Sequence, residues 1–168
     1  MTGVIRSILS MAVLALSVTA ASAQAQGTQV AFGVQPQDSN LPVEVTADQL
    51  SVDQQDGTAI FTGSVLIAQG EMRLAAPWVK VHYLSDQSGI ERLEAKQGVT
   101  LVSGEDAAES ARADYNVVTG VITMQGDVLL VQGTSAITGD RMFVDTVAGT
   151  ARMNGRVKTV LQPEQQQQ

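Results

Sequence analysis

The sequence has no cysteine, a single histidine and only 4% aromatic residues, and each shortage excludes a class of protein. Without cysteine there can be no disulfide framework, thiolate metal site or redox pair. One histidine, His82, rules out any centre that needs two imidazoles. The 17 acidic side chains outnumber the 10 basic ones, for a net charge of -7. An acidic surface argues against nucleic-acid binding, which needs a basic face to neutralise phosphates.

Groups that could carry catalysis or bind a cofactor are equally scarce. His82 lies in an alternating apolar and polar stretch with no nucleophile motif beside it, so we interpret it as a surface histidine. The acidic cluster of Glu105, Asp106 and Glu109 lacks the ligand spacing and the glycine of a calcium loop, and we interpret it as a solvated loop. No glycine-rich phosphate loop occurs. We therefore expect no enzyme activity, no metal site and no cofactor.

The first 23 residues have the pattern of a secretory signal peptide. Arg6 provides a basic start, residues 8–20 form an apolar run, and Ala21-Ser22-Ala23 offers small residues for cleavage, with cleavage after residue 25 as the alternative. An uncleaved membrane anchor is the other interpretation, but the apolar run is shorter than the roughly 20 residues that a spanning helix needs. We expect cleavage and a mature protein that lies outside the cytoplasm.

The rest of the chain divides into one domain and two flanking segments. Residues 24–40 are rich in Gln, Gly, Ser and Pro and predict a flexible lead-in, and residues 162–168 predict a disordered tail. Within residues 41–161, apolar side chains recur at every second position, as in Tyr115 and Val117. That spacing is typical of half-buried β-strands, so the domain is expected to be all-β.

An internal repeat is the most informative feature of the sequence. Turn-like glycines recur at spacings of 32, 31 and 29 residues, and in three units a second glycine follows six residues later; these positions are Gly57, Gly89, Gly120 and Gly149, then Gly63, Gly126 and Gly155. Pairs of a small residue followed by aspartate, called small-Asp pairs below, also recur, at 47–48, 113–114 and 139–140. The second unit departs from the pattern, with Pro77 before Trp78 and with Gly98 displaced. Trp78 anchors either a sheet corner or an interface, and the sequence leaves both open.

A period near 30 residues with many strands indicates a hairpin unit that cannot bury its own apolar face. Glycine inside a strand marks a bulge or bend, and bends in register would fold the array over on itself. We expect an elongated antiparallel β-jelly-roll, or taco, of repeated hairpins with an apolar interior. Its end strands, carrying Val45 at one end and Val157 and Thr159 at the other, are expected to pair with other chains.

Several short motifs, in this order, resemble the OstA-like domain family of periplasmic lipopolysaccharide-transport proteins. They are Pro-Val-Glu-Val at 42–45, Phe-Thr-Gly-Ser-Val at 61–65, Leu-Ala-Ala at 74–76, Ala-Asp-Tyr at 113–115 and Gly-Asp-Val at 126–128. The resemblance covers residues 41–161. It implies a β-jelly-roll that carries lipopolysaccharide from the inner to the outer membrane, with acyl chains of lipid A in an apolar groove.

The resemblance also implies partners and lipid contacts. The partners would be lipopolysaccharide, an LptC-like protein anchored in the inner membrane, an LptD-like outer-membrane translocon, and further copies joined head to tail. The family's lipid-contacting positions align with Val43, Leu101, Tyr115 and Val117.

Other interpretations stay open at this point. From pattern alone, the apolar residues could pack as a dry sandwich core that holds no lipid. A secreted hydrolase on a β-scaffold would need convergent catalytic groups, which this sequence supplies poorly. A structural β-module would link envelope proteins by edge-strand pairing. Lipid that stays with the purified protein would separate these functions.

Overall fold

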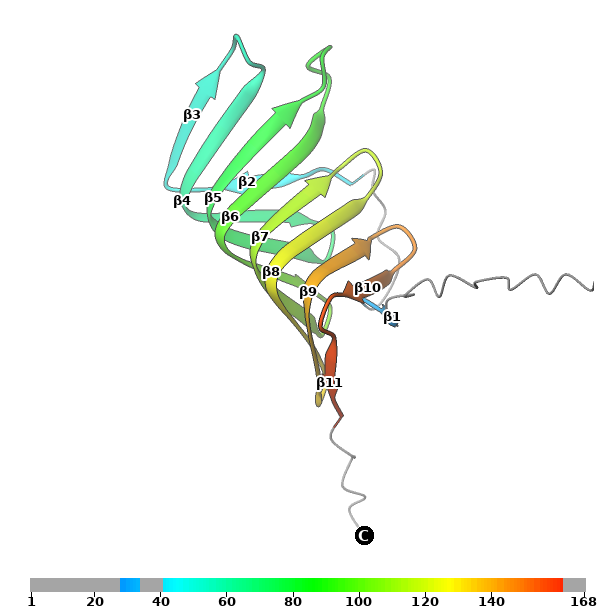
Figure 1. The fold of residues 1–168 in the computed structure, drawn as a ribbon. Coiled ribbons are helices and arrows are strands. Elements are labelled where there is room, and N and C mark those ends of the chain that lie inside the picture. Colours follow the sequence, from blue (N-terminus) through cyan, green and yellow to red (C-terminus); the bar gives the residue numbers. More distant parts are fainter. Residues whose placement is uncertain (1–27, 34–40, 162–168) are drawn as a thin grey trace, which may run out of the picture.

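The computed structural model describes residues 28–33 and 41–161, and every regular element in these ranges is a β-strand (Figure 1). The strands are β1 (Thr28–Ala31), β2 (Glu44–Thr46), β3 (Gln49–Asp53), β4 (Thr58–Gln69), β5 (Met72–Tyr83), β6 (Ile90–Ser103), β7 (Asp106–Asn116), β8 (Val121–Gln132), β9 (Ser135–Asp145), β10 (Thr150–Asn154) and β11 (Lys158–Val160). They form one antiparallel sheet in the order β1-β10-β9-β8-β7-β6-β5-β4-β2, while β3 also pairs with β4 and β11 with β9. The predicted all-β fold is confirmed.

The six long strands, β4 to β9, each bend near the middle, so the sheet folds into two layers (Figure 1). The first layer contains β3, β10, β1 and the halves at 58–62, 78–83, 90–96, 112–116, 121–125 and 141–145. The second layer contains β2, β11 and the remaining halves. Pairing slips at each bend, for example between Thr62 and Val65 and between Gln125 and Val128. The bends are therefore β-bulges placed in register across neighbouring strands.

Backbone conformation at the bends explains the recurring glycines. Gly63 and Gly126 have φ angles of 75° and 85°, and the residue after each, Ser64 or Asp127, is also left-handed. Such a conformation strongly favours glycine, because a Cβ there clashes with the backbone. The space is closed as well, since a Cβ on Gly126 would lie 2.8 Å from the Cβ of Ala111. The glycines predicted to mark bends do lie at bends.

The turn glycines occupy the connections predicted for them. Gly57, Gly120 and Gly149 lie in the loops before β4, β8 and β10 with positive φ, and Gly89 lies in the loop before β6. At the other end of the hairpins, two-residue turns begin with Gly70, Gly104 and Gly133, which are also left-handed.

The small-Asp pairs are not equivalent in the structure. Asp48 lies opposite Gly63 and Asp140 opposite Gly155, and in both cases the Asp N–H donates to the glycine carbonyl at 3.0 Å. Opposite Gly126, however, lies Ala111, so the pair at 113–114 is three positions out of register with the other two. Asp114 instead faces outward and binds Arg92.

Pro77 is explained by the same bend. In β5 it lies in the gap between the paired residues Ala75 and Trp78, where β5 has no ladder partner on β6. Proline lacks an N–H and is excluded from central strands except at such bulges. Pro77, where the second unit departs from the repeat, is therefore compatible with the bend, because it lies at the unpaired position of the bulge.

The segment expected to be a flexible lead-in, residues 24–40, contains an ordered strand. β1 pairs with β10 over four residues, from Thr28 opposite Met153 to Ala31 opposite Thr150. Phe32, which follows, is 4% exposed. Composition did not reveal the strand because its partner is at the far end of the chain. Residues 1–27, which include the predicted signal peptide, residues 34–40 and the predicted tail at 162–168 lie outside the described residues.

Candidate functional site

The space between the two layers is lined by apolar side chains along the whole length of the sheet. Two inward rows belong to the first layer: Leu50, Phe61, Val79, Ala95, Ala113, Met124, Met142 and Met153, then Val52, Ala59, Val81, Leu93, Tyr115, Ile122, Val144 and Ala151. A facing row of the second layer contains Val45, Ile67, Leu74, Leu101, Ala108, Leu130 and Ile137. Most of these residues belong to one buried cluster. The interior is thus continuous from one end of the molecule to the other.

Four methionines contribute to this lining and were not singled out in the sequence. Met72, Met124, Met142 and Met153 are each at most 1% exposed. Methionine is unbranched and flexible, so it can repack around differently shaped apolar partners. Their alternation with polar neighbours, as in Thr-Met-Gln at 123–125, would have placed three of them on inward faces.

One buried polar contact links the two layers. The Tyr115 hydroxyl on β7 donates to Oε1 of Gln69 on β4 at 2.5 Å, and Gln69 in turn donates to the carbonyl of Leu41 at 3.0 Å. Burial raises the pKa of the Tyr115 phenol, against a smaller opposing effect of a hydrogen bond with Thr146. The phenol is therefore neutral at ordinary pH and remains a hydrogen-bond donor inside the apolar space.

All four residues predicted to contact lipid face this interior or its margin. Leu101 and Tyr115 are buried in it at 0% and 1% exposure, one in each layer. Val43 and Val117 are partly buried and pack against the same cluster. The alternation around Tyr115 is as expected, because Asp114 and Asn116 are paired with the outward residues Glu94 and Arg92. Their contact with lipid remains a prediction.

The residues predicted for partner pairing lie on, or directly before, the outermost strands of the second layer. Val45 is the central residue of β2, opposite Ile67. Thr159 is the central residue of β11, opposite Ile137, and Val157 precedes that strand at 38% exposure. In the sheet order, β2 and β11 are at opposite ends of this layer. Their pairing with other chains remains a prediction.

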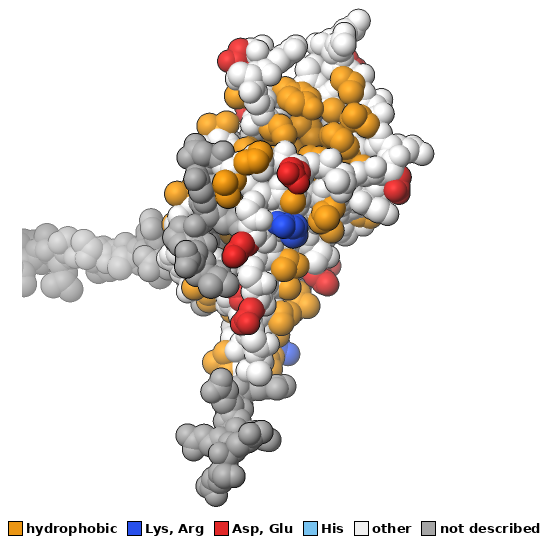
Figure 2. Space-filling model, turned by 180° about the vertical axis from the view of Figure 1, so that it is seen from behind, with side chains coloured by type: hydrophobic (Ala, Val, Ile, Leu, Met, Phe, Trp, Pro, Cys, Tyr) orange, Lys and Arg blue, Asp and Glu red, His pale blue; other side chains and the backbone are white. Residues whose placement is uncertain are grey.

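The sequence did not predict that two apolar residues at one end of the first layer are exposed. Leu50 and Val52 on β3 point inward but are 57% and 59% exposed, because β3 is the outermost strand there. Figure 2 shows apolar side chains gathered on the upper part of the molecule, at the end where β3 lies in Figure 1. Strand alternation alone indicated that they face inward, but exposure could not be inferred without the sheet order.

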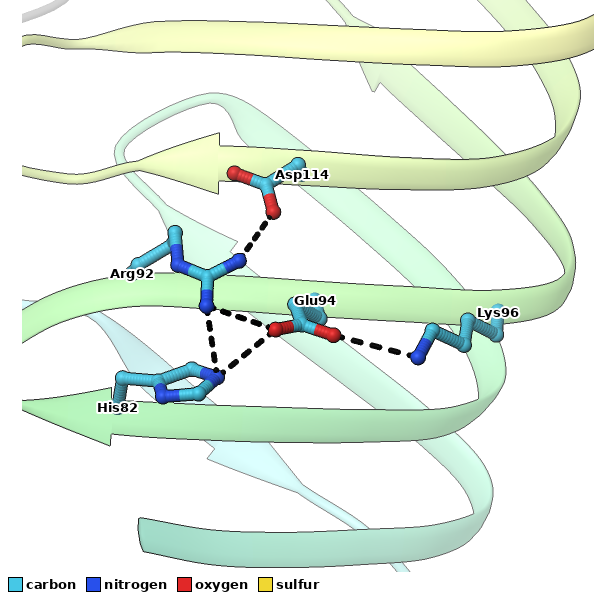
Figure 3. A network of polar contacts seen from close by, with 5 residues as sticks. All are labelled: His82, Arg92, Glu94, Lys96 and Asp114. Atoms are coloured by element: carbon cyan, nitrogen blue, oxygen red, sulfur yellow. Dashed lines mark hydrogen bonds and ion pairs between the residues drawn. The ribbon is translucent and has the colours of Figure 1, made fainter. Parts of the chain in front are cut away.

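His82 belongs to a charged network on the outer face of the first layer (Figure 3). Its Nε2 lies 3.0 Å from Oε1 of Glu94. Arg92 bridges Glu94 at 2.7 Å and Asp114 at 2.6 Å, and Lys96 approaches the other oxygen of Glu94 at 3.2 Å. These contacts join β5, β6 and β7. The network braces neighbouring strands and contains no nucleophile.

Burial and ion pairing act in opposite directions on Glu94. Partial burial alone would raise the pKa of its carboxyl group, but the hydrogen bond from Lys96, the charge of Arg92 and the contact with His82 outweigh it and lower the pKa. The Lys96 ammonium also lies 4.7 Å from the centre of the Trp78 ring, at cation–π distance. Trp78 thus packs beside the bend on the outer face, which supports the sheet-corner interpretation.

In residues 28–33 and 41–161, no group of three or more His, Cys, Asp or Glu side chains is arranged to hold a metal ion. The three acidic residues considered at 105–109 do not converge: Asp106 accepts hydrogen bonds from the Gly33 N–H and the Gln132 amide. No helix among the described residues is long and apolar enough to cross a membrane.

Comparison with known proteins agrees with this architecture. Residues 44–150 match the family described as LptA/(LptD N-terminal domain) LPS transport protein. An uncharacterised protein of Rhizobium meliloti (strain 1021) is 29% identical, covering 95% of this chain and 92% of the relative. The lipopolysaccharide export system protein LptA of Escherichia coli (strain K12) is 26% identical, covering 92% of this chain and 88% of the relative.

A solved structure has the same fold. It is the crystal structure of LptH, the LptA-homologous periplasmic component of the lipopolysaccharide transport device of Pseudomonas aeruginosa. The TM-score is 0.68 at 19% identity, over 76% of this chain and 100% of that chain. Because the family match extends over most of the chain, this protein belongs to the LptA/LptD N-terminal-domain family of lipopolysaccharide-transport proteins, a family of transport proteins rather than enzymes.

Proposed function

We propose that this chain is a periplasmic carrier that holds the acyl chains of lipid A between its two layers. It would pass lipopolysaccharide from an LptC-like protein at the inner membrane to an LptD-like translocon at the outer membrane. The observation that carries the proposal is the apolar lining, which continues from β3 and β2 at one end to β10 at the other. The named relatives, which belong to lipopolysaccharide export or transport systems, support the choice of ligand.

The energetics explain why such a lining is needed. Each acyl chain has on the order of a dozen methylenes, at about 0.8 kcal/mol each to bury. Exposing one chain to water therefore costs roughly 10 kcal/mol, and several chains travel together. A carrier must match this burial along the whole route. Small and flexible lining residues such as Ala95, Ala113 and Met124 leave room for, or repack around, an incoming chain.

The layers must separate for acyl chains to enter, because the lining residues now pack against one another. Tyr115 and Gln69 form a cross-layer hydrogen bond in this closed arrangement. We propose that entering lipid displaces that contact and takes the place of the packed side chains. The polar sugars of the lipid would remain outside the apolar space.

A photo-reactive residue placed singly at 115, 116 or 117 tests the lipid-binding face. Tyr115 and Val117 face the apolar interior, whereas Asn116 faces outward with Arg92. Cross-linking to lipopolysaccharide is expected from 115 and 117 and not from 116. Mass spectrometry of the native protein after gentle extraction should also detect bound lipopolysaccharide.

The position at 116 is the matched control, because it lies between the two inward positions, at the last residue of β7. Equal labelling at all three positions would contradict the proposed binding face. Labelling at none of them, in protein that remains folded, would favour the alternative of a structural β-module whose interior is a dry core.

A further inference from the structure

The first-layer edge of β10 is occupied by the chain's own amino-terminal segment, residues 28–33. β1 pairs with β10, and the Phe32 N–H continues the ladder by donating to the Gly149 carbonyl at 3.1 Å. Phe32 is 4% exposed and belongs to the interior cluster. The strand thus covers the sheet edge, and the phenyl ring closes the interior at that end.

Further contacts hold this segment across the layers. The Gly33 N–H donates to Oδ2 of Asp106 at 2.7 Å, and the Gln132 amide donates to the carbonyl of Ala31 at 2.7 Å and to the same Asp106 oxygen at 3.0 Å. Asp106 and Gln132 belong to the second layer, whereas β10 belongs to the first. The segment is therefore attached to both layers, yet it lies before residue 44, where the family match begins.

The position of β1 is also where the β3 strand of a second copy would fit. Eight strands from β3 to β10 alternate in direction, so another β3 beyond β10 would run antiparallel to it, as β1 does. With Leu50 in the place of Thr28 and Val52 in the place of Val30, both inward rows would continue directly from Met153 and Ala151. The exposed Leu50 and Val52 would then become buried.

Charge and edge exposure support the same partner. In that register Ser51 would lie opposite Arg152, with the carboxylate of Asp53 on the same outward face of the strand. Among the described residues, no further strand pairs with the outer edge of β3, whose apolar residues are exposed, whereas β10 is covered by β1 of its own chain. Pairing with a second copy would bury the apolar residues of β3 in one copy and cover the edge of β10 in the other.

We propose that residues 28–33 form a cis-acting cap that holds the place of a second copy's β3 on β10, so that head-to-tail joining requires the cap to leave. This inference rests on the proposed function, because a carrier gains a longer apolar route when interiors join end to end. Capping would keep free copies from joining before they are assembled.

An engineered disulfide can lock the cap. Because Phe32 and Gly149 are a hydrogen-bonded pair, alternation makes Gln29 and Arg152 a non-hydrogen-bonded pair, whose Cα atoms lie closest. Both side chains are exposed. Gln29→Cys with Arg152→Cys gives the only two cysteines in the full chain, so oxidation can form a single intramolecular bridge. The reduced form of the same protein is its control.

Light scattering over a concentration series would measure self-association. We expect the oxidised variant to stay monomeric and the reduced variant to associate. Phe32→Ala should associate at least about tenfold more tightly than the wild type, because the joining-competent form becomes more populated. Adding Leu50→Asp to Phe32→Ala should abolish association, whereas the outward-facing Ser51→Asp should retain it.

The proposal is overturned if the oxidised and reduced forms of the double-cysteine variant associate equally, or if the Phe32→Ala protein remains monomeric. In another outcome, Phe32→Ala stays monomeric but binds fluorescent rough lipopolysaccharide more tightly than the wild type. Lipid, and not a second copy, would then be what takes the place of the cap on β10. The same lipopolysaccharide titration separates the two proposals. If no form binds it, the carrier function fails while the scattering result still decides the cap.

Discussion

Among single residues, left-handed backbone and crowding distinguish the glycines from one another. Gly126 has a φ of 85° and a closed neighbourhood at Ala111, whereas Gly133 has a φ of 54° and no atom within 4 Å of the point where a Cβ would lie. The positive φ angle disfavours a side chain at both positions, but a side chain would also clash with a neighbouring residue only at Gly126. Two separate requirements, backbone conformation and space, therefore favour glycine at the bend.

Gly126→Ala should lower the free energy of unfolding by ~1–3 kcal/mol, through backbone strain and the clash with Ala111. Gly133→Ala, which meets only the backbone cost, should lose about 1 kcal/mol. Denaturant unfolding would measure both. Adding Ala111→Gly to Gly126→Ala should recover part of the loss; no recovery would contradict the steric explanation.

Glu94 predicts a pH dependence of stability. The pKa of its carboxyl group is lowered in the folded protein. The ionised carboxylate therefore stabilises the fold at pH values above the usual glutamate pKa, and this stabilisation is lost as the pH falls through the lowered pKa. Glu94→Gln should therefore cost roughly 1 kcal/mol at pH 7. The difference from the wild type should shrink below about pH 4.

Unfolding curves at pH 7 and at acidic pH would show this. Glu105→Gln, at an exposed turn residue, is the control and should change little at either pH. A Glu94→Gln difference that stays constant across the pH range would mean that the charge of Glu94 does not contribute.

Among the strands, the decisive feature is that each layer ends in short strands with different exposure. In the first layer β3 is open and β10 is covered by β1. In the second layer β2 and β11 are outermost. Edge strands invite pairing with other chains unless charge or covering prevents it. The second layer therefore offers its own test of end-to-end joining.

Thr159→Lys should weaken head-to-tail association in the Phe32→Ala background. Thr159 faces the interior row beside Ile137, where the Val45 of a second copy would follow, and a lysine there would place a charge at that apolar junction. We expect association to fall about tenfold or more, which corresponds to about 1.4 kcal/mol. Both the wild-type threonine and its strand are exposed, so folding should be retained.

Val160→Lys is the matched control, because Val160 faces outward, opposite Ala136. Light scattering and thermal unfolding would be recorded for both variants. If the two lysines weaken association equally, the inward row is not the part of the edge that joins.

For the molecule as a whole, the closed interior predicts how lipid changes stability. A ligand that binds only the folded protein stabilises it by about 2.7 kcal/mol at a free concentration 100 times the Kd. Rough lipopolysaccharide should then raise the Tm by roughly 10 °C. The deacylated core oligosaccharide, which lacks the chains to be buried, should have little effect. Equal shifts from both ligands would indicate binding through the sugars instead.

Features that depend on neighbouring residues could be predicted from the sequence alone. The two-residue period placed Tyr115 and Val117 on one face and Asp114 and Asn116 on the other, and the sheet register agrees. Glycine spacing located the hairpin loops and the bends at Gly63 and Gly126, because a left-handed backbone is a local requirement. These features follow from backbone geometry, which acts over a few residues.

Which distant residues meet was determined only by the folding of the whole chain. The Tyr115–Gln69 contact joins residues 46 positions apart, and Gln132 reaches the carbonyl of Ala31 across 101 positions. Neither partner has a distinctive local pattern. For the same reason a segment whose composition suggested a flexible lead-in became the strand that covers β10. A strand is stabilised by hydrogen bonds to its neighbour, and the neighbour of β1 exists only once the whole sheet has folded.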